Sequence, residues 1–112
     1  MLSYFLMPHP PIIIPEVGNG REEEVRNTIN ACIEVGKRVE ELNPDTIIIV
    51  TPHGTVFRDA IAMITDKEIV GNFGDFGAPQ VELKYEINRE LSMRIIKNAE
   101  EEGIAVAQLD KS

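Results

Sequence analysis

The chain has 112 residues and a formal net charge of −8, because 19 Asp and Glu residues outnumber 11 Lys and Arg residues. This length allows one hydrophobic core but not two, and 43% hydrophobic with 27% charged residues is typical of a globular domain, not of a disordered or fibrous chain. The negative charge repels phosphate backbones and no run of basic residues is present, so we expect no nucleic-acid partner.

The first residues carry no recognisable targeting or membrane signal. They are apolar but lack a basic start, and Pro8 interrupts them far short of a membrane span. The one cysteine, Cys32, cannot form an intramolecular disulfide and lies in a helical apolar pattern, so we interpret it as a small core residue. We therefore expect a cytoplasmic protein that does not associate with membranes.

The first half of the chain predicts a strand, a loop, a helix and a second strand. Residues 2–7 form a short apolar strand, and four closely spaced prolines turn residues 8–19 into a loop. A helix is expected from about Gly20 to Leu42, because acidic residues follow its start, Asn43-Pro44 stops it, and it carries one apolar stripe. The stripe comprises Val25, Ile29, Cys32, Ile33, Gly36, Val39 and Leu42.

The residues after this helix are typical of a buried strand. Thr46–Thr51 is a β-branched run without polar alternation, as in strands covered on both faces of a parallel sheet, and Pro52 ends it. With the preceding elements it forms a βαβ pattern, whose two strands run parallel with a right-handed crossover.

The second half continues this alternation. Residues 60–65 and 68–70 are expected to be strands, and residues 71–79, with three glycines, a flexible loop. A second helix is expected along an apolar stripe that Gly103 caps, followed by a strand over residues 104–109. The stripe comprises Leu83, Ile87, Leu91, Ile95 and Ala99. The sequence thus predicts an α/β fold with a mostly parallel or mixed sheet and flanking helices.

The chain stops directly after this last strand, so the predicted sheet looks truncated. We therefore interpret residues 1–112 as the N-terminal part of a single domain. An incomplete sheet has an open edge and an uncovered apolar face, which favours self-association or a partner subunit.

The strongest signal for chemistry is a repeated Pro-His step. The chain has two histidines, and both His9 and His53 follow an apolar run and a proline. Ligands of parallel α/β sheets bind beyond the carboxyl ends of the strands, so the two imidazoles are expected to converge there. Two imidazoles with one carboxylate hold non-haem Fe(II), and with an open position they also suit Zn²⁺.

Structural interpretations compete with each of these signals. A histidine at the end of a strand is often only a hydrogen-bonded side chain. The glycine spacing of residues 71–79 fits neither the dinucleotide-binding fingerprint nor the P-loop, which favours a connector. The acidic runs Glu22–Glu24 and Glu100–Glu102 are typical of solvated helix faces.

Residues 6–18, Leu-Met-Pro-His-Pro-Pro-Ile-Ile-Ile-Pro-Glu-Val-Gly, and residues 44–54, Pro-Asp-Thr-Ile-Ile-Ile-Val-Thr-Pro-His-Gly, resemble a known family. They are similar to the catalytic LigB-like domain of class III extradiol ring-cleavage dioxygenases, in the branch that includes the AmmeMemoRadiSam proteins and Memo. The resemblance covers essentially the whole chain but only the N-terminal part of the family domain.

The resemblance implies that His9 and His53 bind Fe(II), and that the substrates are a catechol-type aromatic diol and O₂. In active members a glutamate near the far end of the domain is the third ligand and another histidine is the acid/base. Neither has a counterpart here, so the catalytic acid/base is unknown. Glu16 and Asp59 are the nearest carboxylates in sequence, but their spacing requires neither to face the metal.

Two other functions fit the same residues. Memo-like relatives share the fold and are associated with peptide binding or with copper, so a non-catalytic binding module is one alternative. A Zn²⁺-dependent hydrolase is the other, because the same ligands suit zinc. The metal is therefore expected to be Fe(II), with Zn or Cu as alternatives.

Overall fold

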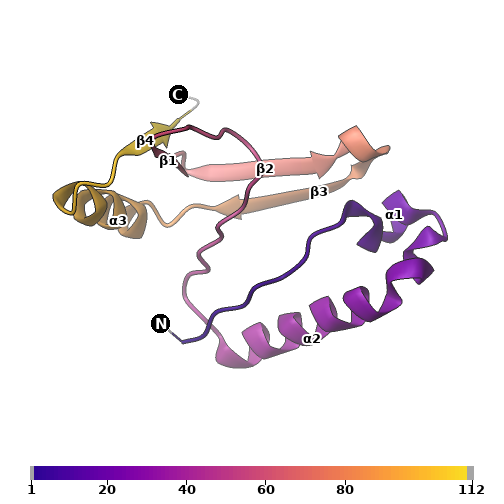
Figure 1. Ribbon diagram of the computed structural model, residues 1–112. Coiled ribbons are helices and arrows are strands. Elements are labelled where there is room, and N and C mark those ends of the chain that lie inside the picture. The colour runs from indigo at the N-terminus through magenta and orange to yellow at the C-terminus, as the bar shows by residue number, and fades with distance from the viewer. Residues whose placement is uncertain (1, 111–112) are drawn as a thin grey trace. The chain divides into compact units, whose positions relative to one another are not determined.

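The computed structural model describes residues 2–110 (Figure 1). The chain divides into two compact units: one comprises the residues up to Ile47 with Asn72–Glu82, the other Ile48–Gly71 with the residues from Leu83 onward. The elements of the described part, in chain order, are η1 (Pro11–Ile13), α1 (Pro15–Gly18), η2 (Arg21–Val25), α2 (Arg26–Leu42), β1 (Ile61–Ile64), β2 (Glu68–Phe73), η3 (Gly74–Phe76), β3 (Ala78–Glu86), α3 (Arg89–Glu101) and β4 (Val106–Leu109), where η denotes a 3₁₀-helix.

The long helix of the first unit confirms the prediction for residues 20–42. Its first turn is the 3₁₀-helix η2, and α2 continues to Leu42. Asn43 then adopts a left-handed conformation with φ of 46°, and its amide donates to the carbonyl oxygens of Val39 and Glu40, 3.1 Å away in each case. This closes the helix, and Pro44 prevents the chain from continuing it.

The second unit contains a parallel pair of strands. Ile61 of β1 lies opposite Val106 of β4, and the register continues to Ile64 opposite Leu109. Helix α3 contacts β4 and carries Ile96, which is 2% exposed and belongs to the small apolar core of the described residues. Both strands were predicted from sequence, within residues 60–65 and 104–109, and the structure confirms them.

Strands β2 and β3 form an antiparallel hairpin (Figure 1). The amide of Ile87 donates to the carbonyl oxygen of Lys67 (2.9 Å), and Lys84 pairs with Glu68 across the strands (3.3 Å). The loop predicted at residues 71–79 is shorter in the structure, because residues 71–73 belong to β2 and β3 begins at Ala78. The turn between them consists of η3 and Gly77, whose φ of 82° suits glycine.

The helix predicted from Leu83 is wrong in its first turn, because residues 83–86 belong to β3 and α3 begins at Arg89. Apolar residues at 81, 83 and 85 alternate with charged residues at 82, 84 and 86, which is the period of a strand. Leu83 also lies four residues before Ile87, which is a helical spacing, and the predicted helix therefore starts too early. The start of the helix is marked by Asn88, whose side chain accepts a hydrogen bond from the amide of Leu91 (3.0 Å).

The two strands predicted at residues 2–7 and 46–51 are not strands in the structure. A strand needs a hydrogen-bonded neighbour, and in residues 2–110 the β-ladders join only β1 with β4 and β2 with β3. The predicted βαβ start around α2 is therefore absent, although the α/β class with a mixed set of strands is confirmed. The unpaired segments leave apolar side chains at the surface, with Leu6 fully exposed and Val50 94% exposed.

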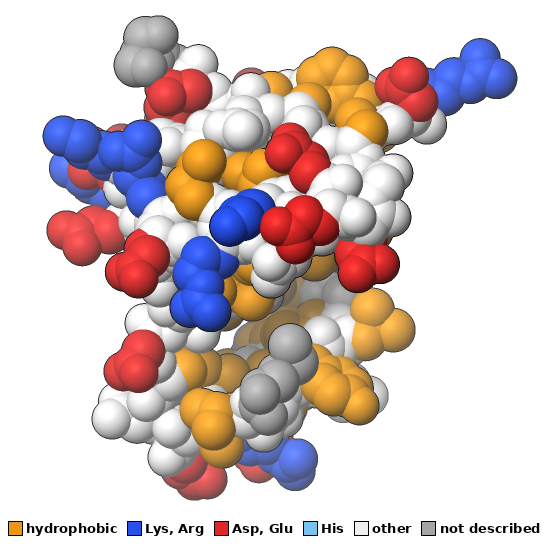
Figure 2. Space-filling model, turned by 90° about the vertical axis from the view of Figure 1, so that its left-hand side faces the viewer, with side chains coloured by type: hydrophobic (Ala, Val, Ile, Leu, Met, Phe, Trp, Pro, Cys, Tyr) orange, Lys and Arg blue, Asp and Glu red, His pale blue; other side chains and the backbone are white. Residues whose placement is uncertain are grey.

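The surface mixes apolar and charged side chains (Figure 2). Besides the two unpaired segments, β1 and β3 expose large apolar residues, among them Ile61 and Leu83. Within the described residues, no helix has both the length and the apolar character needed to cross a membrane. Cytoplasmic residence and self-association stay predictions.

Candidate metal centre

His9 lies near the end of the N-terminal segment, two residues before the first 3₁₀-helix. Its side chain is exposed. Pro8 and Pro10 flank it, and Pro10 caps η1 with φ of −70° and ψ of 131°. The proline rings restrict φ on both sides of His9, so the backbone that carries this imidazole has little freedom to rotate.

The residues after His9 form a compact turn. The amide of Ile13 donates to the carbonyl oxygen of Pro10 (3.2 Å) and that of Ile14 to Pro11 (3.1 Å). Helix α1 follows, and η1 also contacts α2. The loop predicted for residues 8–19 therefore consists largely of two short helices, of which η1 contacts α2 and α1 contacts η1 and η2.

His53 lies in an irregular, exposed segment of the second unit. Its backbone amide donates to the hydroxyl oxygen of Thr51 (3.2 Å), and Gly54 follows with φ of 88°. The Thr-Pro-His-Gly sequence therefore folds as a local turn that presents the imidazole at the surface.

Each histidine belongs to a different unit of the chain, so their predicted convergence stays a prediction. Glu16 is exposed on α1 of the first unit, and Asp59 is exposed before β1 of the second. Among residues 2–110 no group of three or more His, Cys, Asp or Glu side chains has the arrangement of a metal site. Cys32 is half-buried on α2.

The acidic run Glu22–Glu24 is only partly the solvated face that the sequence indicated. Glu23 and Glu24 are exposed and pair with Arg26 and Arg21. The hydrogen bond from the Arg26 guanidinium holds the pKa of the Glu23 carboxyl below its ordinary value. Glu22 differs, because it is half-buried and its carboxylate accepts a hydrogen bond from the amide of Gly20 (2.7 Å).

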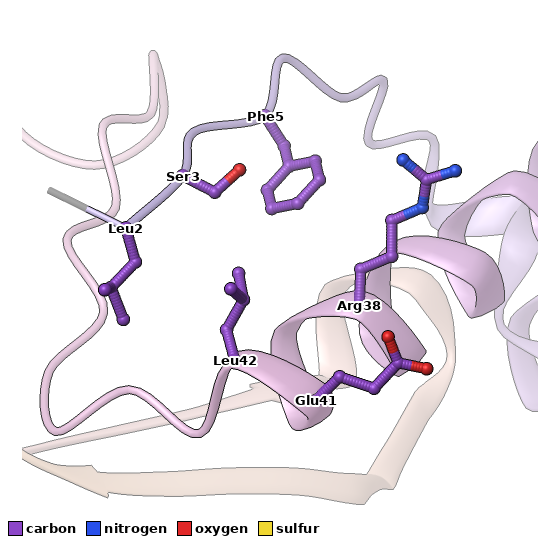
Figure 3. Close-up of a pocket in the computed structure, with 6 residues that line it drawn as sticks. All are labelled: Leu2, Ser3, Phe5, Arg38, Glu41 and Leu42. Carbon is purple, nitrogen blue, oxygen red and sulfur yellow. The ribbon is translucent and has the colours of Figure 1, made fainter.

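The first unit also contains an open pocket that sequence analysis did not predict (Figure 3). It has a volume of about 420 Å³ and lies between the N-terminal segment and the last turns of α2. Neither histidine lines it. The nearest cation, Arg38, hydrogen-bonds to Glu34 one turn back on the same helix (3.4 Å). The lining residues are Leu2, Ser3, Phe5, Arg38, Glu41 and Leu42.

Comparisons with known proteins identify the relatives of this chain. Residues 3–111 match the family described as the catalytic LigB subunit of aromatic ring-opening dioxygenase. The chain is 46% identical over 102 residues to Protein CA_C1420 of Clostridium acetobutylicum, an alignment that covers 91% of this chain and 22% of that protein. The chain thus spans about a fifth of the length of this relative. No solved structure matches significantly.

Proposed function

Since the chain belongs to the family of catalytic LigB subunits of aromatic ring-opening dioxygenases, we propose that it forms part of a non-haem Fe(II) site. The substrates of this site are a catechol-type aromatic diol and O₂, and the ring opens beside the diol. Both atoms of O₂ enter the product, so the reaction consumes no external reductant.

The observation that carries the proposal is the repeated Pro-His step within the matched residues. His9 and His53 are both exposed and follow prolines, so each imidazole lies at the surface on a restricted backbone. Imidazole is a suitable ligand for Fe(II), and the chemistry of these two donors fits the group. When bound, Fe(II) supplies open coordination positions for the diol oxygens and for O₂.

In this proposal the histidines hold the metal on one side and leave the other side open to substrate. We assign the carboxylate ligand and the acid/base to groups outside the described residues, since neither Glu16 nor Asp59 is supported by its position. Protons compete with the metal for the imidazole nitrogens, so the proposal includes metal binding that weakens as the pH falls.

The test is divalent-metal binding by the chain and by the variants His9→Ala and His53→Ala, titrated anaerobically with Fe(II). Each substitution is expected to weaken binding by at least about tenfold, because each removes a ligand. Glu16→Gln and Asp59→Asn are matched controls that are expected to bind like the parent. Parental binding by both histidine variants would contradict the proposal.

A second measurement addresses the reaction. Catechol-dependent O₂ uptake after anaerobic Fe(II) loading is expected in the protein as its native cell produces it. Metal binding through both histidines without uptake on any diol would contradict ring cleavage and favour a binding module or a zinc hydrolase. The Memo-related branch of the family is likewise part of the proposal.

A further inference from the structure

We infer that Glu22 is a positioning residue for His9. Its side chain holds the turn at Gly18–Gly20 against the 3₁₀-helix that follows His9, and it thereby keeps the imidazole where it binds metal. This inference rests on the metal role proposed for His9, and all residues in it belong to the first unit.

The first step is the contact between Glu22 and the turn. The Glu22 carboxylate accepts the hydrogen bond from the Gly20 amide (2.7 Å). It also packs on Gly18, which is buried: a Cβ atom added at Gly18 would lie 2.6 Å from Oε2 and 3.0 Å from Cβ of Glu22. Glu22 thus touches the turn at two points, whereas the neighbouring Glu23 and Glu24 are exposed.

The second step leads from the turn to the loop that carries His9. The same Cβ position at Gly18 lies 2.9 Å from the carbonyl oxygen of Ile12, so Gly18 fills a narrow space between Glu22 and η1. The Gly18 amide donates to the carbonyl oxygen of Ile14 (2.8 Å). Only Pro10 and Pro11 separate Ile12 from His9. Because proline fixes φ, the position of Ile12 restricts the position of the His9 backbone and of its imidazole.

The third step is that the turn depends on a hydrogen-bond acceptor outside its own backbone. Asn19 and Gly20 are consecutive residues in the left-handed region, with φ of 50° and 99°. Asparagine and glycine both adopt this region readily, so the backbone is not strained, and the turn depends instead on an acceptor for the Gly20 amide. The Glu22 carboxylate is this acceptor, and an amide oxygen at the same place would also accept the hydrogen bond.

The experiment compares Glu22→Ala with Glu22→Gln in the 112-residue chain, with Glu23→Ala as the matched control. Co(II) serves as the metal probe, because its absorption spectrum reports ligand geometry as well as affinity. Glu22→Ala is expected to weaken Co(II) binding roughly tenfold, which is the lower end of the affinity loss when a residue that orients a metal ligand is removed. It is also expected to change the Co(II) spectrum. Glu22→Gln is expected to restore both, and Glu23→Ala to leave both unchanged.

Amide hydrogen exchange provides a readout without metal. Glu22→Ala is expected to accelerate exchange at Ile13, Ile14 and Gly18 and to leave α2 protected. Gly18→Ala, which wedges the same space open, is expected to do the same. Unchanged exchange and unchanged Co(II) affinity in Glu22→Ala would overturn the inference, as would failure of Glu22→Gln to restore them.

The two proposals fail in different ways. If His9→Ala binds Co(II) like the parent, the metal role of His9 is wrong, whatever Glu22 does. If His9→Ala loses binding and Glu22→Ala retains it, His9 is a ligand and the positioning role of Glu22 is wrong.

Discussion

The backbone amide and the hydroxyl of Thr65 both donate to the carbonyl oxygen of Leu109, at 2.9 Å and 3.4 Å. Thr65 is 5% exposed and follows β1 directly, while Leu109 is the last residue of β4. The two hydrogen bonds join the ends of β1 and β4, and the second one gives the buried Thr65 hydroxyl a hydrogen-bond partner.

Replacement of this hydroxyl is expected to have a small, measurable cost. Thr65→Val keeps the shape of the side chain and removes the longer of the two bonds, so the free energy of unfolding should fall by about 0.5–1.5 kcal/mol. Chemical denaturation measures this value. Thr55→Val, at an exposed position, is the control and should lie within about 0.5 kcal/mol of the parent.

The core of the second unit depends on Ile96. Ile96→Ala removes most of a side chain that is 2% exposed on α3, and the free energy of unfolding is expected to fall by about 2–4 kcal/mol. Met93→Ala on the same helix, where the side chain is 45% exposed, should cost much less. Equal losses in the two variants would contradict this account of the core.

The end of α2 depends on the left-handed conformation of Asn43. Asn43→Ala is expected to destabilise the chain by about 1 kcal/mol, because alanine pays the steric cost of positive φ, and Asn43→Gly should be neutral or slightly stabilising. Thermal unfolding of the two variants measures the difference. A lower melting temperature for Asn43→Gly than for Asn43→Ala would contradict it.

The start of α2 is expected to depend on pH through Glu23. Its pKa is lowered in the folded chain, chiefly by the hydrogen bond from Arg26, so the pair stabilises the fold above the unfolded pKa of Glu23. This contribution is lost as the pH falls through the lowered, folded pKa. NMR titration of the carboxyl should show the low pKa, and Arg26→Gln should return it towards the ordinary value. Because both groups are at the surface, salt is expected to reduce the shift.

Metal removal tests the chemistry proposed for His9 and His53. Chelation is expected to abolish catechol-dependent O₂ uptake, and Fe(II) is expected to restore it, whereas Zn²⁺ should bind without restoring it because zinc has no redox chemistry. An oxygen electrode measures the uptake. Recovery with Zn²⁺ would contradict an iron-dependent ring cleavage.

Local patterns determined much of this fold. Apolar periodicity, capping residues and prolines act within a few positions, so they predict helices and strands from the sequence alone. They predicted the helix of residues 26–42 with its end at Asn43, and the strands at residues 61–64 and 106–109. The two Pro-His steps that define the candidate metal centre are also local, and the match over residues 3–111 confirmed the LigB family that they indicated.

Tertiary structure decided which apolar runs became strands. Residues 46–51 contain more β-branched residues than residues 106–109, but only residues 106–109 pair with another strand. Strand formation requires hydrogen bonds to a segment that is distant in sequence, and local composition does not supply them. Leu83 fits a helical apolar stripe, but it belongs to β3, which pairs with β2. The contact of Glu22 with Gly18 was equally hidden, since a sequence shows an acidic run but not which carboxylate faces a buried turn.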